Sequence, residues 1–265
     1  MIGAIIGDIV GSIYEFSNHR SKDFPFFSDD CFFTDDTVMT LAVGKAIKDF
    51  KDSKETDLSV AAVKFMQSIG RPYPHCGYGG NFFCWINAKE PKPYNSFGNG
   101  AAMRVSAAGF AAENIEEAKQ LSRMVTEVSH NHPEGIKGAE AVAVAIYLAK
   151  TGTRKDIIEE VIKQKYYAVD FTLDSIRKTY RFNETCQDTV PQAFRAFFES
   201  TSFEDAIRNA ISVGGDSDTL AAITGSIAEA YYGVSKSLEQ AALTYLDDRL
   251  TIAYNECRDY NKILG

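Results

Sequence analysis

Residues 34–42 read TDDTVMTLA, and residues 214–225 read GGDSDTLAAITG. Each stretch places two aspartates and a threonine directly before an apolar segment with helical spacing. Aspartate and threonine cap helices, and the helix dipole stabilises a carboxylate at the N-terminus by about 0.3–1 kcal/mol. One such motif is explained by capping alone. Two motifs with the same pattern, about 180 residues apart, indicate helix N-termini that serve one shared site.

The number of carboxylates exceeds what capping requires. A cap needs one acceptor, whereas each motif supplies two carboxylates and a hydroxyl group. If the two helix N-termini meet in the fold, four carboxylates converge, and two unit charges about 4 Å apart repel by about 4 kcal/mol at an effective dielectric constant near 20. Protonation or a bound cation must offset this repulsion. Asp35 and Asp36 point about 100° apart on a helix, so they can serve two ions, or one ion and one supporting role.

Oxygen ligands of this kind suit hard divalent ions such as Mg²⁺, Mn²⁺ or Ca²⁺. Other motifs for such ions do not fit the spacing. An EF-hand loop would continue as D-x-D-x-D-G, but the chain reads DSDTLA from Asp216. The D-D-x-x-D motif of helical prenyl-diphosphate enzymes fails because Met39 occupies the place of its last aspartate.

The cysteine pattern indicates reduced thiols. The five cysteines are widely spaced and form no C-x-x-C pair, as expected of a cytoplasmic protein. The conceivable zinc ligands lack zinc-finger spacing, and we interpret them as buried or incidental side chains. They are His75, Cys76 and Cys84, with His130 or His132.

Composition is that of an ordinary globular protein. Of 265 residues, 45% are hydrophobic and 24% charged, and the net charge is −8. No segment reaches about 18 uncharged apolar residues, so no membrane span is expected. The apolar start, MIGAIIGDIVGS, carries Asp8 and no basic leading region, which argues against a signal peptide. Because no basic cluster is visible, a surface that coats nucleic acid is not expected either.

Apolar residues recur with helical spacing through nearly the whole chain. Only residues 165–171, KYYAVDF, are ambiguous between helix and strand. The Gly/Pro-rich breaks at 70–81, 91–100 and 131–135 are too short to be interdomain linkers. The pattern predicts one all-α domain of about ten helices. The predicted helices are 38–50, 58–68, 101–112, 115–128, 134–149, 154–164, 188–199, 203–213, 219–231 and 236–248, and the stretch 236–262 is expected to pack on its own domain.

Five segments occur in an order that points to a family. They read GDIVGSIYEF (7–16), TDDT (34–37), GNGAAMR (98–104), SHNHPEGIKGAEAVA (129–143) and GGDSDTLAAITGSIAEAYYG (214–233). Together they resemble the ADP-ribosylglycohydrolase family, which includes dinitrogenase-reductase-activating glycohydrolases. The resemblance covers residues 3–233, and its specific part is TDDT combined with GGDSDT. It implies a single compact, orthogonal multi-helix domain over residues 1–265, a binuclear Mg²⁺ or Mn²⁺ centre, and hydrolysis of the bond between ADP-ribose and an acceptor.

The resemblance also assigns residues to the metals and the chemistry. Ser217 stands where the family often has threonine, and it keeps a hydroxyl group. Glu15 matches a glutamate that members near the serine- and O-acetyl-ADP-ribose-specific branch use beside the metals; without the resemblance it would be a solvated residue after an apolar helix. Glu15, Asp35 and Asp36 are the candidates for taking the proton of the attacking water. The implied metal ligands are Thr34, Asp35, Asp36, Asp216, Asp218 and Thr219.

Substrate contacts are expected from two glycine-rich loops and a histidine. The loop 98–100, GNG, can bring backbone amides close to a phosphate at the start of a helix, although Asn-Gly is most often only a turn. The loop 77–83, GYGGNFF, can close over a ribose or adenine. The resemblance makes His130 a contact to ADP-ribose. The predicted substrate-binding residues are Tyr78, Gly79, Gly98, Asn99, Gly100, Met103 and His130.

Neighbouring residues are expected in supporting roles. Asp8 is predicted to cap or brace its own segment, Arg104 to support the site from behind, and His132 to lie at a helix start. The basic residues Arg20, Lys22 and Arg71 could contact an acceptor, with a solvated surface role as the alternative.

Three functions remain open from the sequence. The first is a metal-dependent hydrolase that removes ADP-ribose from a protein side chain, a nucleic acid or a small metabolite. The second is a catalytically silent ADP-ribose-binding or structural relative, against which the retained carboxylates argue. The third is a metal-dependent enzyme for another phosphorylated ribosyl substrate, such as an immunity protein paired with an ADP-ribosylating toxin. The expected partner is an ADP-ribosylated substrate, and a monomer is expected.

Overall fold

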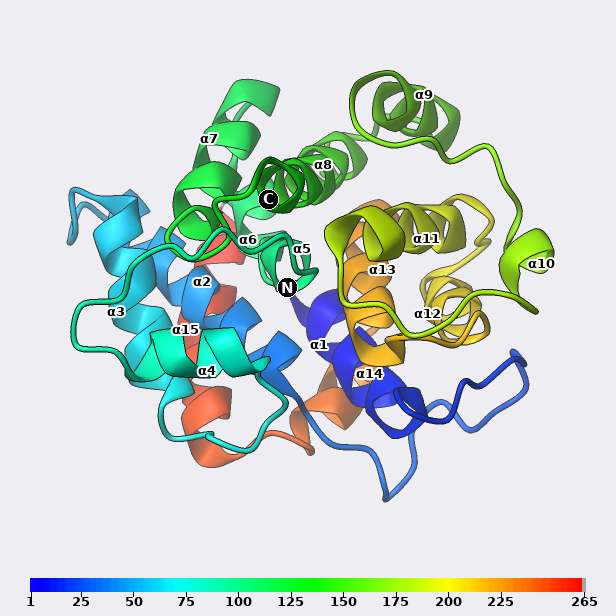
Figure 1. Cartoon of the computed structure of the whole chain (residues 1–265), viewed down its shortest axis with the longest axis horizontal. Helices are drawn as coiled ribbons and strands as arrows, with labels where there is room; N and C mark the ends of the chain where they lie inside the picture. Colours follow the sequence, from blue (N-terminus) through cyan, green and yellow to red (C-terminus); the bar gives the residue numbers. More distant parts are fainter. Residues whose placement is uncertain (264–265) are drawn as a thin grey trace.

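Helices make up nearly all the regular structure of the computed structural model, which describes the backbone of residues 1–263 and the side chains of residues 1–258 (Figure 1). Within this range no β-strand forms, and Gly98 and Thr185 make an isolated β-bridge. The helices are α1 (Ile2–Gly11), η1 (Ser12–Tyr14), α2 (Asp35–Lys51), α3 (Leu58–Gly70), α4 (Gly80–Asn87), α5 (Gly100–Met103), α6 (Ser106–Ala111), α7 (Ile115–Thr126), α8 (Pro133–Lys150), α9 (Lys155–Lys165), α10 (Leu173–Ile176), α11 (Cys186–Phe198), α12 (Phe203–Ile211), α13 (Ser217–Tyr232), α14 (Lys236–Leu243) and α15 (Asp248–Ile263). The predicted all-α fold is confirmed.

Helices α1 and α13 lie side by side at the centre of the molecule (Figure 1). Glycines on α1, spaced four residues apart, let the two backbones touch. A Cβ atom on Gly3 would lie 2.2 Å from the carbonyl oxygen of Gly225, and one on Gly7 would lie 2.1 Å from that of Ala221. Backbone atoms cannot yield to such overlaps, so this packing requires glycine at both positions.

The next glycine of this series connects the packing to the acidic motif. A Cβ atom on Gly11 would lie 2.5 Å from the Cα atom of Asp218, in the first turn of α13. Asp8, on the same turn of α1 as Gly11, is fully buried. The close contact of α1 and α13 therefore brings the 214–225 motif next to a buried carboxylate of α1.

Asp8 fixes the N-terminus of α2. Its carboxylate accepts hydrogen bonds from the backbone N–H groups of Thr34 (2.9 Å) and Thr37 (3.0 Å), and from the Thr34 hydroxyl (2.7 Å). The prediction that Asp8 braces its own segment was wrong: it braces the start of the following helix, because α1 and α2 pack together. Asp8 therefore positions the TDDT motif beside α13.

Two predicted helices are interrupted. The stretch 101–112 forms α5 and α6, which are separated at Arg104 and Val105; the break lies where the Arg104 side chain enters the core, fully buried. The stretch 236–248 ends as α14 at Leu243, and the chain turns before α15 begins. The ambiguous residues 165–171 form the end of α9 and a loop.

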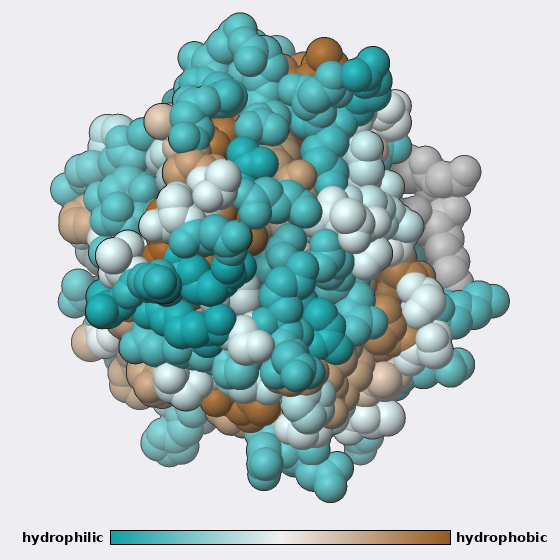
Figure 2. Space-filling model, turned by 90° about the vertical axis from the view of Figure 1, so that its right-hand side faces the viewer, coloured by the Kyte–Doolittle hydropathy of each residue, from teal (hydrophilic) through white to brown (hydrophobic). Residues whose placement is uncertain are grey.

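One continuous core of buried side chains joins the helices. Leu250, Tyr254 and Cys257 of α15 are buried in it, which confirms, for the side chains described, that the C-terminal stretch packs on its own domain. On the face shown in Figure 2, apolar residues form separate small patches between hydrophilic ones. Across the described residues, no helix combines the length and apolar content that a membrane crossing needs.

Candidate functional site

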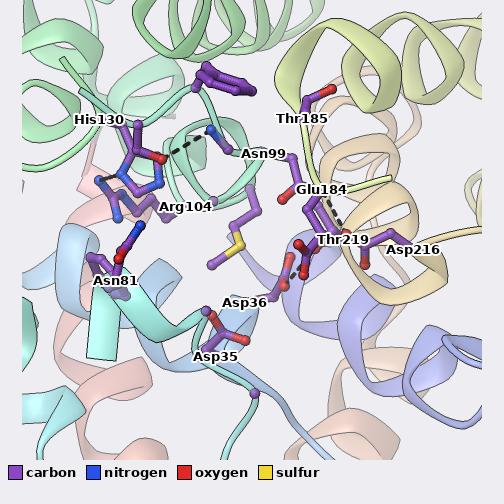
Figure 3. Close-up of a pocket in the computed structure, with 18 of the residues that line it drawn as sticks. Asp35, Asp36, Asn81, Asn99, Arg104, His130, Glu184, Thr185, Asp216 and Thr219 are labelled. Carbon is purple, nitrogen blue, oxygen red and sulfur yellow. Dashed lines mark hydrogen bonds between the residues drawn. The ribbon is translucent and has the colours of Figure 1, made fainter. Parts of the chain in front are cut away.

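A cavity of about 420 Å³ opens where the N-termini of α2 and α13 approach the loop before α5 (Figure 3). The acidic side chains lie on one side of it, and Arg104 and His130 lie on the other. The residues that line it are Glu15, Asp35, Asp36, Gly77, Gly79, Gly80, Asn81, Phe82, Tyr94, Asn95, Ser96, Phe97, Gly98, Asn99, Gly100, Met103, Arg104, His130, Glu184, Thr185, Asp216, Asp218 and Thr219.

The two acidic motifs meet in this cavity. The hydroxyl group of Thr219, on α13, donates a hydrogen bond of 3.0 Å to Oδ2 of Asp36, on α2. Thr34 forms the N-cap of α2, and Asp216 forms the N-cap of α13. Each helix N-terminus therefore carries its aspartates into the same space, as one shared site requires.

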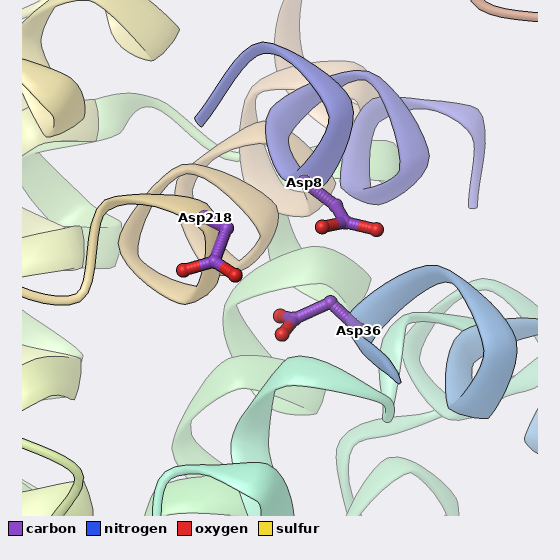
Figure 4. Close-up of side chains that lie close together, drawn as sticks. All are labelled: Asp8, Asp36 and Asp218. Atoms are coloured by element: carbon purple, nitrogen blue, oxygen red, sulfur yellow. The ribbon is translucent and has the colours of Figure 1, made fainter. Parts of the chain in front are cut away.

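The carboxylates form two overlapping groups. Oxygen atoms of Asp8, Asp36 and Asp218 lie within 4.8 Å of one another (Figure 4), as do oxygen atoms of Glu15, Asp216 and Asp218. Asp218 belongs to both groups. Oδ1 of Asp36 and Oδ1 of Asp218 are buried and have no hydrogen-bond partner. An unpartnered buried carboxylate oxygen is costly, and either a proton or a divalent cation would offset this cost.

Within residues 1–258, no cationic side chain forms an ion pair with these groups. In the part of the chain that the structure describes, the ion pairs of lysine, arginine and the N-terminus all involve other carboxylates. Both oxygens of Asp8 are already occupied by Thr34 and Thr37. The oxygens that remain for an ion are therefore chiefly those of the two motifs and Glu15.

Burial and mutual repulsion raise the pKa values of the acidic side chains. Burial, then the charge of Asp218, raises the pKa of Asp35 and of Asp36 well above the usual range. Burial raises the pKa of Asp216 to about 6, against the opposing effect of its hydrogen bonds. Burial and the charges of Asp218 and Asp8 raise the pKa of Glu15 to about 8. Without a cation the cluster holds protons, and a cation would replace them.

Asn99 links the GNG loop to the acidic side of the cavity. Its side-chain Nδ2 donates to Oδ2 of Asp216 (2.6 Å) and to the Thr189 hydroxyl (3.2 Å), and its backbone N–H donates to the carbonyl oxygen of Glu184 (2.7 Å). The backbone N–H of Gly98 is also occupied, by the Ser96 hydroxyl. The loop thus orients a carboxylate of the second motif and keeps few amides for an anion.

The side of the cavity opposite the carboxylates is basic. Arg104 is fully buried, and its guanidinium group lies 5.2 Å from the centre of the Phe82 ring. Nη2 of Arg104 donates to the Ser129 hydroxyl (2.8 Å), which lies 2.8 Å from Nδ1 of His130. The cavity therefore has an acidic end suited to cations and a basic end suited to anions.

Comparison with known proteins identifies the family of the chain. A model of the ADP-ribosylglycohydrolase family matches residues 1–260.

The chain belongs to the ADP-ribosylglycohydrolase family.

Its similarity to individual relatives is distant. Human ADP-ribosylhydrolase ARH3 is 24% identical, with 89% of this chain and 85% of ARH3 covered. ADP-ribosylarginine hydrolase Tri1 of Pseudomonas putida (strain GB-1) is also 24% identical, with 89% of this chain and 70% of Tri1 covered. A solved structure of an ADP-ribosylglycohydrolase-related protein complex shares the fold, with a TM-score of 0.66, 21% identity, and coverage of 94% of this chain and 97% of that one.

Most of the metal-binding, catalytic and substrate-binding residues predicted from the sequence line the cavity, with two exceptions. Tyr78 does not line it; its hydroxyl donates to the carbonyl oxygen of Gly70 (3.2 Å). Thr34 lies behind Asp36, caps α2, and donates its hydroxyl hydrogen to Asp8. Among the side chains described, no metal-binding group contains His75, Cys76 or Cys84, and all five cysteines are free thiols.

The other polar residues that the sequence singled out hold the fold together. His132 caps α8 by accepting the backbone N–H of Glu134 (3.1 Å). Arg20 donates to the backbone carbonyls of residues 177, 180 and 213, and Arg71 donates to those of residues 86 and 88. Lys22 forms an ion pair with Asp205. These contacts occupy the three basic side chains away from the cavity lining.

Sequence reasoning missed part of the cavity lining. Asn81 and Phe82 come from the predicted loop 77–83 but were not singled out. Tyr94, Glu184 and Thr185 come from irregular segments that carry no local signal. The β-bridge between Thr185 and Gly98 brings Glu184 and Thr185 to the cavity.

Proposed function

We propose that the protein is a hydrolase that cleaves the glycosidic bond between ADP-ribose and an acceptor, with two divalent cations, Mg²⁺ or Mn²⁺, at the acidic end of the cavity. The observation that supports this most strongly is the meeting of the two motifs with unpartnered carboxylate oxygens in a cavity whose other end is basic. An ADP-ribosyl group has ribose hydroxyls at the reacting end and an anionic diphosphate behind them, so its polarity matches that of the cavity.

The donor set fits the ions that we propose. The ligands would be Asp35, Asp36, Asp216, Asp218 and Thr219, with Thr34 behind them and Glu15 beside Asp218. Bound ions would act as Lewis acids and as a template for the ribose hydroxyls. Asp218, which both carboxylate groups share, would help to hold an ion in either group. Asn99 orients Asp216 through its side-chain amide, and such supporting contacts commonly affect metal affinity by 10- to 100-fold.

Protein side chains would carry out the proton transfers. In the reaction a bond forms between water oxygen and C1″ of the ribose, and the bond from C1″ to the acceptor atom breaks through an oxocarbenium-like transition state. A carboxylate takes the water proton, and a protonated acidic group gives a proton to the acceptor atom as it leaves. Glu15 is half-buried at the cavity wall, in the same carboxylate group as Asp216 and Asp218. Cations bound there would lower its raised pKa, so that its carboxylate could accept a proton from water. Asp35 and Asp36 are the other candidates for the base.

The identity of the acceptor needs a direct test. One relative is named as an ADP-ribosylarginine hydrolase, whereas the name of the other, ADP-ribosylhydrolase, specifies no acceptor. The experiment incubates the protein with ADP-ribosyl-arginine, ADP-ribosyl-serine, O-acetyl-ADP-ribose and ADP-ribosylated DNA, each with Mg²⁺, with Mn²⁺ and with a chelator. We expect ion-dependent release of ADP-ribose from at least one substrate. If none is hydrolysed and ADP-ribose still binds, the protein is a silent binding relative instead.

A further inference from the structure

Arg104 is a buried cation without an acidic partner. Its side chain is fully buried, and within residues 1–258 it forms no ion pair. Its Nε and Nη1 atoms are buried without hydrogen-bond partners. Only Nη2 makes hydrogen bonds, to the Ser129 hydroxyl (2.8 Å) and, more weakly, to Nδ1 of His130 (3.4 Å). Keeping such a charge buried is costly. We therefore look for the role of Arg104 in its hydrogen bonds to Ser129 and His130.

The three side chains leave one arrangement of hydrogens that satisfies every contact. The guanidinium group can only donate, so Ser129 Oγ accepts from Arg104. The Ser129 hydrogen is then free to donate to Nδ1 of His130, 2.8 Å away. A proton on Nδ1 would face the Arg104 N–H and leave the buried Ser129 hydrogen unbonded. Nδ1 is therefore the acceptor, and the single imidazole proton lies on Nε2.

Nε2 faces the substrate side of the cavity. It lies 3.4 Å from where a Cβ atom on Gly100 would be and 3.6 Å from where one on Gly98 would be. Within the described residues, nothing accepts its hydrogen. The rings of Phe82 and Tyr94 lie beside the imidazole, and among the described residues no carboxylate forms an ion pair with it. Burial, together with the charge of Arg104, lowers the pKa of His130 well below its usual value.

We propose that Arg104 and Ser129 are positioning residues that hold His130 as the neutral Nε2–H tautomer, which presents a permanent hydrogen-bond donor to an anionic group of the ligand bound against residues 98–100. That this anion is the diphosphate of an ADP-ribosyl group rests on the proposed function. His130 then binds and orients without exchanging protons. The titratable and charged groups that face it are Arg104 and Tyr94, neither of which changes charge between pH 5.5 and about 8.

Imidazole nitrogen NMR on the full chain tests the tautomer directly. The protein has four histidines, and comparison with His130→Gln assigns the signals. We expect Nε2–H and an unprotonated Nδ1 at every pH from about 5.5 to 8. Ser129→Ala should mix the two neutral tautomers, whereas Ser129→Thr, which keeps the hydroxyl group, should restore the wild-type signals.

Calorimetric binding of ADP-ribose in Mg²⁺ gives the second readout. We expect Ser129→Ala to weaken binding about tenfold, as loss of one hydrogen bond to an anion predicts. Ser122→Ala is the matched control, because Ser122 is equally buried on α7 and its hydroxyl donates to the carbonyl oxygen of Lys119.

A charged ring or an Nδ1–H tautomer in the wild-type protein would overturn the proposal. So would a Ser129→Ala variant whose His130 signals and ADP-ribose affinity both match those of Ser122→Ala. If the tautomer behaves as expected but the wild-type protein does not bind ADP-ribose, the positioning assignment stands and the proposed function fails.

Discussion

Replacing Asp218 by asparagine should have opposite effects on the metal-free and the metal-bound protein. Asp218 lies in both carboxylate groups, and its partner oxygens lie within 4.8 Å. Two ionised carboxylates at that separation repel by about 3.5 kcal/mol at an effective dielectric constant near 20. Protonation already relieves part of this repulsion, since the pKa of Asp218 is raised by burial and by Asp216. Asp218→Asn should therefore stabilise the metal-free protein by about 1–2 kcal/mol, or roughly 2–6 °C in melting temperature.

The same substitution should remove the response to metal. A divalent ion that binds only the folded wild-type protein adds about 2.7 kcal/mol at 100 times its dissociation constant, and the variant loses the shared ligand. Calorimetric melting in chelator and in excess Mn²⁺ measures both effects, with Asp30→Asn, at an exposed position, as the control. If Asp218→Asn melts at a lower temperature in chelator, or retains the full increase with Mn²⁺, the electrostatic reasoning is wrong.

Three further outcomes follow from the packing, the pKa values and the Asn99 contact. Gly7→Ala should destabilise the protein by about 3 kcal/mol or more in urea unfolding, because its Cβ would lie 2.1 Å from the carbonyl oxygen of Ala221. Gly79→Ala is the control and should destabilise the protein far less, because no atom lies within 4 Å of its Cβ position. Equal losses of stability in the two variants would contradict the packing argument. The pKa of Asp216 rises from 3.8 to about 6 on folding, so its contribution of about 3 kcal/mol to the metal-free protein should be present below about pH 4 and lost as the pH rises through 6. The stabilisation by Mn²⁺ should grow over the same interval, and stability curves that run the other way would refute the assignment. Asn99→Ala should weaken Mn²⁺ binding at least tenfold through Asp216, as measured by titration calorimetry, whereas the exposed Asn87→Ala should leave it unchanged.

Local signals predicted much of the fold and the acidic half of the site. Capping residues and apolar periodicity are properties of short segments, so most of the longer helices and the positions of Asp35, Asp36, Asp216 and Asp218 were readable. Helix α4 was not, because it begins inside the glycine-rich stretch 77–83 that was predicted to be a loop. Their repulsion also indicated that they needed a partner. The break at Arg104 was not readable from local signals. The buried Arg104 side chain at this break contacts Ser129, 25 residues further on.

The features that the sequence did not predict depend mainly on long-range contacts. The four-residue spacing of Gly3, Gly7 and Gly11 is visible in the sequence, but the backbone of α13 that requires it lies more than 200 residues away. For the same reason the sequence did not reveal that Asp8 caps α2 or that Asn99 holds Asp216. Tyr78 was predicted from loop composition, which gives no information about the direction of a side chain.

Anomalous diffraction at the manganese edge, from crystals grown with Mn²⁺, tests the central claim most directly. The account predicts two ions between the N-termini of α2 and α13, bound by oxygens of Asp35, Asp36, Asp216 and Asp218, with Asp218 shared between them. Strong manganese peaks elsewhere on the protein, with the space among these carboxylates free of metal, would contradict it.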